Sequence, residues 1–202
     1  MSEILGIGAV EGLYGHDETK EDLSEALERV SMDLRFGPML WANVAGTYIV
    51  IKSICSDQEE ASEGYAFDKL RKDITNLTRK VFFTRWDHQL IVEDIRYLAM
   101  EQPVVEKQQL RDGLLSCLKP LLKEVDNTYS ATFLNIYKYH GIVAELKTIA
   151  QILSSTHLTP KLREKGEDLK VSLGYYGANY GHQTYLFFQT EIMQLIDLLE
   201  KG

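Results

Sequence analysis

The chain contains few of the residues that mark a specialised chemistry, with only two cysteines and four prolines among its 202 residues. Cys55 and Cys117 form neither a CxxC nor a Cys/His spacing, so they predict buried reduced thiols, with a single disulfide as the alternative. P-loop, GxSxG and helix-opening GxGxxG motifs are all missing. We therefore predict no catalytic residue, no cofactor and no metal, and lean away from an enzyme.

Two further absences concern location and partners. No basic segment precedes the short apolar stretch at the N-terminus, so no secretory signal is evident and a cytoplasmic location is expected. Positive charge is also scarce, because 30 acidic residues face 22 basic ones and give a formal charge of −8. A field of that sign repels phosphates and argues against nucleic-acid binding.

One basic stripe runs against this overall charge. Its members are Lys69, Arg71, Lys72, Arg79, Lys80 and Arg85. Acidic residues are dense in the segments 11–33 and 57–63, so the stripe is expected to face acidic neighbours within the same chain.

The strongest pattern in the sequence is a heptad seam, in which apolar positions alternate by three and four residues. It consists of Phe67, Leu70, Ile74, Leu77, Val81, Thr84, His88, Ile91, Ile95 and Leu98. Such a pattern predicts one continuous helix over 65–101, roughly 48 Å long at about 1.5 Å per residue, with one stripe that needs a partner helix.

The remaining helical patterns predict an all-α fold. Further helices are expected over 19–35, 38–55, 104–125, 128–155, 160–173 and 182–201. Thr19 and Asp22 have the spacing of a capping box, and Pro120 predicts a kink or a restart. No strand signature is evident. We predict one domain over 1–202, an elongated bundle of about six helices around the long heptad helix, preceded by a glycine-rich apolar arm over 1–15.

Helix 38–55 is apolar around most of its circumference, which is typical of a helix at the centre of a bundle. Its length also sits at the lower margin of a membrane span. Together with the apolar arm over 1–15, it leaves open a membrane-active protein that inserts both segments, such as a pore-forming or toxin-like component.

Two groups of residues are candidates for binding. His88 and His140 lie near the middle of apolar helical faces, where they could meet as a buried polar pair beside Tyr137, although neither has the spacing of a metal ligand. The glycine-rich segment 174–185 predicts a connection whose aromatic side chains could contact a partner or ligand. Its candidates are Tyr175, Tyr176, Tyr180, His182 and Tyr185.

These observations rank three functions. The first is protein-protein binding as an adaptor, inhibitor or assembly subunit, with another protein or a second copy as partner. The second is the membrane-active protein described above. The third is a small-molecule-binding protein or an all-α enzyme.

Overall fold

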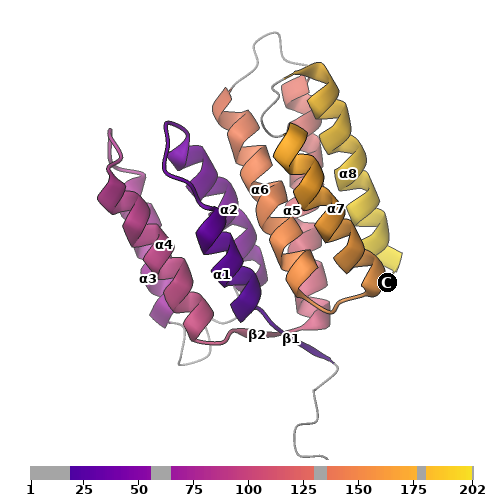
Figure 1. Cartoon of the computed structure of the whole chain (residues 1–202), viewed down its shortest axis with the longest axis horizontal. Coiled ribbons are helices and arrows are strands. Elements are labelled where there is room, and N and C mark those ends of the chain that lie inside the picture. Colours follow the sequence, from indigo (N-terminus) through magenta and orange to yellow (C-terminus); the bar gives the residue numbers. More distant parts are fainter. Residues whose placement is uncertain (1–18, 56–64, 130–135, 177–180, 202) are drawn as a thin grey trace, which may run out of the picture.

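A computed structural model describes residues 19–55, 65–129, 136–176 and 181–201, and these residues are mostly helical. Eight helices lie side by side in the described part of the chain (Figure 1). They are α1 (Ser24–Asp33), α2 (Leu40–Cys55), α3 (Tyr65–Leu77), α4 (Arg85–Met100), α5 (Lys107–Tyr129), α6 (Ile136–Ser155), α7 (Pro160–Tyr176) and α8 (His182–Lys201). The all-α prediction is confirmed at this level. The arm over 1–15 lies outside the described residues.

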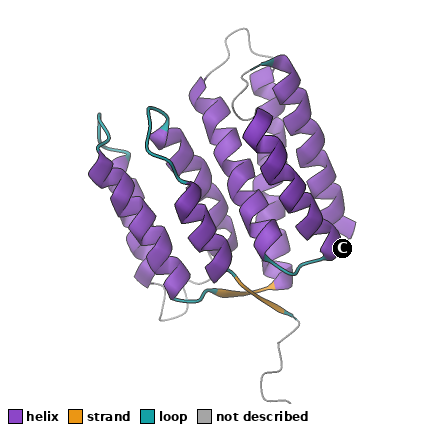
Figure 2. Cartoon of the chain, in the orientation of Figure 1, coloured by secondary structure: helices purple, strands orange, loops and turns teal. Residues whose placement is uncertain are grey.

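Two short strands join one end of the helices, where the sequence predicted only helix. β1 (Lys20–Asp22) pairs antiparallel with β2 (Val104–Glu106), and the two ribbons cross below the helices (Figure 2). The predicted capping box at Thr19 and Asp22 is therefore wrong, because α1 begins two residues after Asp22. Asp22 Oδ1 instead accepts the backbone N–H of Ser24 at 2.8 Å.

The predicted continuous helix over 65–101 is wrong. α3 ends at Leu77 and α4 begins at Arg85, so the heptad seam folds back on itself as a hairpin. Leu70 and Ile74 of α3 pack beside Ile91 of α4. The apolar stripe thus finds its partner helix within its own length, and no long central helix remains.

Helices α1 and α2 lie between the α3–α4 hairpin and the group α5 to α8 (Figure 1). α2 is buried along most of its length, as expected for a core helix, and it packs closely on α6. Within the described part of the chain, no helix combines the length and the apolarity needed to cross a bilayer.

The C-terminal half differs in detail from the predicted segments. α5 runs through Pro120 without a restart and reaches Tyr129, and α7 passes through Gly174 and ends at Tyr176. Cys55 and Cys117 are both buried and free, as predicted. Cys117 Sγ lies 2.6 Å from the hydroxyl of Ser53, so it packs at the contact between α5 and α2.

Candidate functional site

The predicted tyrosine segment over 174–185 does not form one exposed loop. Tyr175 is 69% exposed near the end of α7, but Tyr185 is 1% exposed inside α8 and packs in the core. The ring of Tyr176 stacks on Phe187 with 4.3 Å between ring centroids. Tyr180 lies outside the described residues, and His182 is described only as the first residue of α8. The rings of Tyr175 and Tyr176 meet edge to face with 5.1 Å between centroids, whereas Tyr185 belongs to the core, so the described tyrosines differ in exposure.

The two predicted histidines occupy different sites. His88 Nε2 lies 2.6 Å from the carbonyl oxygen of Leu34, and because a carbonyl only accepts, the imidazole donates. This bond satisfies an end carbonyl of α1. His140 instead lines a cavity between α1, α2 and α6, and no ring contact or hydrogen bond joins the two imidazoles. Tyr137 is exposed rather than buried.

The most exposed apolar side chains gather where α3 turns into α4. Val81 is 84% exposed, Phe82 is 82% exposed and Trp86 is 83% exposed. The connection between α1 and α2 adds Phe36, and the half-buried rings of Trp41 and Phe83 lie beneath. We call these residues the apolar tip: Phe36, Trp41, Val81, Phe82, Phe83 and Trp86.

Contacts between rings hold the two parts of the apolar tip together. Trp41 of α2 stacks on Phe83 with 5.8 Å between ring centroids. The guanidinium of Arg85 lies 5.9 Å from the centre of the Phe36 ring, and the same ring meets His88 edge to face. The connections α1–α2 and α3–α4 stand at the same end of the helices (Figure 1). Packing thus fixes Phe36, Trp41 and Phe83, and the exposed side chains of Val81, Phe82 and Trp86 stand beside them.

A capping box fixes the direction of α4 at this tip. Thr84 and Asp87 exchange side-chain bonds with each other's backbone N–H groups, and Lys80 pairs with the Asp87 carboxylate. Burial raises the pKa of Asp87, but the hydrogen bonds from Lys80 and Thr84 outweigh it and hold that pKa below its ordinary value. The carboxylate therefore stays charged at neutral pH and anchors the turn.

Positive charge surrounds the apolar tip. Arg79, Arg85 and Arg35 are exposed, and among the described residues no carboxylate pairs with any of them. Elsewhere in the basic stripe, Lys69 pairs with Asp73 and the buried Asp94, Arg71 pairs with Asp68, and Lys80 pairs with Asp87. These carboxylates belong to the α3–α4 hairpin itself rather than to the predicted acidic segments.

The heptad interpretation hid the apolar tip, because it placed Val81 in the seam of a helix. Two signals could have shown the turn. Val81, Phe82 and Phe83 are consecutive, and successive side chains on a helix point about 100° apart, so one apolar stripe cannot bury all three. Thr84-x-x-Asp87 also has the spacing of a helix start in the middle of the supposed helix.

Comparisons of the chain with protein-family models, with curated proteins and with solved structures each found no match.

Proposed function

We propose that this chain acts by binding another protein, and that the apolar tip is its docking surface. The observation that supports this most directly is the exposure of Val81, Phe82 and Trp86, three neighbouring apolar side chains that are each more than four-fifths exposed. Burying such a side chain contributes about 1.5–3 kcal/mol, and three side chains left in water contribute almost none of this to the stability of the fold. A partner surface would recover that free energy.

The chemistry of the tip also defines the partner. Trp and Arg are among the residues most enriched at the energetic centres of protein interfaces, and the apolar tip contains Trp41 and Trp86 and is bordered by Arg85. Three of its rings are already held, by the contacts between Trp41 and Phe83 and between Arg85 and Phe36, so less ordering entropy is lost at those rings on binding. The surrounding arginines favour a negatively charged surface. The partner is therefore an acidic protein segment that also presents apolar side chains.

The identity of the binding segment can be tested by site-specific cross-linking of the full chain. Phe82 is replaced by a photoreactive phenylalanine analogue, and the same analogue is placed at Val171, which is equally exposed on α7. After irradiation in native lysate, position 82 should yield one dominant cross-linked protein, with the attachment mapped by mass spectrometry to an acidic segment. Position 171 should not yield that product.

Other products would contradict the proposal in distinct ways. A cross-linked dimer formed by the purified chain would show that the tip binds a second copy. Flotation of the chain with phosphatidylserine vesicles, abolished by Trp86→Ser, would show that it docks on a membrane instead. Equal labelling from both positions would show that the apolar tip has no selective partner.

A further inference from the structure

A cavity of about 150 Å³ lies between α1, α2 and α6. One part of its wall is apolar and consists of Val30, Leu34, Val143 and Ala144. Thr47 and Thr148 also line it, but their hydroxyls bond to each other at 3.2 Å, and Thr148 donates to the carbonyl of Ala144 at 2.9 Å. Selective contacts with a ligand must therefore come from the other polar side chains.

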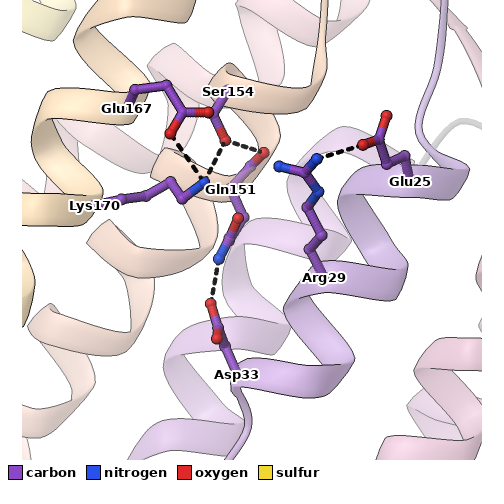
Figure 3. Close-up of polar contacts among 7 residues, drawn as sticks. All are labelled: Glu25, Arg29, Asp33, Gln151, Ser154, Glu167 and Lys170. Carbon is purple, nitrogen blue, oxygen red and sulfur yellow. Dashed lines mark hydrogen bonds and ion pairs between the residues drawn. The ribbon is translucent and has the colours of Figure 1, made fainter.

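Gln151 has an unused acceptor in this wall. Its Nε2 donates to Asp33 Oδ2, so the two side chains face each other between α6 and α1 (Figure 3). Since a carboxylate oxygen only accepts, the amide nitrogen must be the atom that faces Asp33. Gln151 is 8% exposed, and its Oε1 is buried without a hydrogen-bond partner. A buried acceptor left unpaired costs free energy, which a donor from a ligand would recover.

Two positive charges complete the wall. Arg35 and Lys147 both line the cavity, and among the described residues neither forms an ion pair. His140, which like Lys147 belongs to α6, also lines the cavity. Burial and the charge of Lys147 lower the pKa of His140, so its imidazole is neutral at pH 7 and adds no third charge. The cavity thus combines cations, one carboxylate, an unpaired acceptor and an apolar wall.

We propose that this cavity binds a small free amino acid with an aliphatic side chain. Its carboxylate pairs with Lys147 and Arg35, its ammonium group pairs with Asp33, and the Gln151 side chain turns so that its buried Oε1 accepts from the same group. Its side chain packs on the wall that contains Val30 and Leu34. A closed apolar cavity of about this volume holds benzene, so a ligand of about six to eight non-hydrogen atoms is the right size.

Three probes separate the groups that this proposal needs. L-valine carries both charges, isovalerate lacks the ammonium group, and isobutylamine lacks the carboxylate, while all three share the same branched hydrocarbon. Each is titrated into the full chain labelled with ¹⁵N, and amide shifts of Val143 and Gln151 report on the cavity. L-valine should bind at least tenfold more tightly than either analogue. Equal affinities, or no shifts up to about 10 mM, would overturn the proposal.

Two variants test which residue pairs with the carboxylate of the ligand and which pairs with its ammonium group. Lys147→Gln should weaken L-valine and isovalerate at least tenfold and leave isobutylamine unchanged, whereas Asp33→Asn should weaken L-valine and isobutylamine only. Lys52→Gln, an exposed position on α2 outside the cavity, should change none of the three. Lys147 is exposed and makes no ion pair among the described residues, so its variant should fold even if Asp33→Asn does not. Unchanged affinities of Lys147→Gln for L-valine and isovalerate would overturn the assignment of Lys147 to the ligand carboxylate.

Discussion

At the scale of single residues, Gly46 sets how closely α2 can approach α6. A Cβ at Gly46 would lie 2.5 Å from the carbonyl oxygen of Gly141 and 3.0 Å from Ala144 Cβ, distances that backbone atoms cannot relieve by rotating. A Cβ at Gly141 would meet nothing nearer than the Ala42 carbonyl oxygen at 4.0 Å. Only one of these two glycines is thus required by packing.

This difference predicts opposite effects of two matched substitutions. Gly46→Ala should lower the free energy of unfolding by about 1–3 kcal/mol, because the added methyl group forces the helices apart. Gly141→Ala should leave it unchanged or raise it by up to about 1 kcal/mol, since alanine favours a helix over glycine. Urea denaturation of both variants measures the two values. Equal losses would show that α2 and α6 do not meet as described.

Glu145 should make stability depend on pH. Burial, with a smaller contribution from nearby Glu124, raises the pKa of Glu145 to about 8 from an ordinary 4.5. Between those values the folded chain holds a proton that the unfolded chain releases, so this stabilising contribution is complete below pH 4.5 and is lost as the pH rises through 8.

Glu145→Gln removes this titration, so the stability of the variant relative to the parent should rise with pH. The variant should match the parent near pH 4.5 and exceed it by a few kcal/mol near pH 8.5, as measured by thermal unfolding at both pH values. Glu164→Gln, at an exposed position on α7, is the matched control and should follow the parent throughout. Parallel pH profiles for all three chains would refute a protonated Glu145.

At the scale of elements, the capping box decides where the α3–α4 hairpin turns. Thr84→Ala removes the acceptor for the backbone N–H of Asp87 and should cost about 1 kcal/mol of unfolding free energy in urea denaturation. Thr84→Ser should retain most of that stability. Thr75→Ala, an exposed threonine within α3, should be neutral or mildly stabilising. If Thr75→Ala lowers the free energy of unfolding as much as Thr84→Ala does, the capping box makes no specific contribution to stability.

The sequence predicted the helices well where one face is buried, and failed where two interpretations share the same pattern. A stripe such as Leu70, Ile74, Ile91 and Ile95 satisfies a long coiled coil and a folded hairpin equally, and only the local cap at Thr84 distinguishes them. The strands β1 and β2 were missed because three residues are too few to show the alternation of apolar and polar side chains that is typical of a strand.

The candidate sites were harder to predict because they depend on which helices become neighbours. His140 was predicted to be a buried polar residue beside His88, but it is half-buried and lines a cavity with residues of α1 and α2. Polar positions four residues apart, such as Lys147 and Gln151, could have indicated a shared polar face on this helix. Nothing in sequence order could have placed Asp33 opposite Gln151.

At the scale of the whole molecule, the net charge of the chain and the local charge around the apolar tip have opposite signs. The chain carries a formal charge of −8, but its apolar tip is bordered by arginines without a carboxylate partner among the described residues. Salt screens charges beyond about 8 Å under physiological conditions, so an acidic partner segment that touches only the tip experiences the local positive charge rather than the distant negative charge. An acidic protein can thus present a basic docking surface.

We propose that the apolar tip supplies most of the binding free energy. The most direct measurement is the affinity of the segment cross-linked at position 82, made as a peptide and titrated into the full chain by calorimetry. Trp86→Ala should weaken binding at least 30-fold, a loss of about 2 kcal/mol that is typical of an interface hot spot. Val171→Ala on α7 should change it less than about twofold. Equal affinities of the parent and Trp86→Ala would contradict the account.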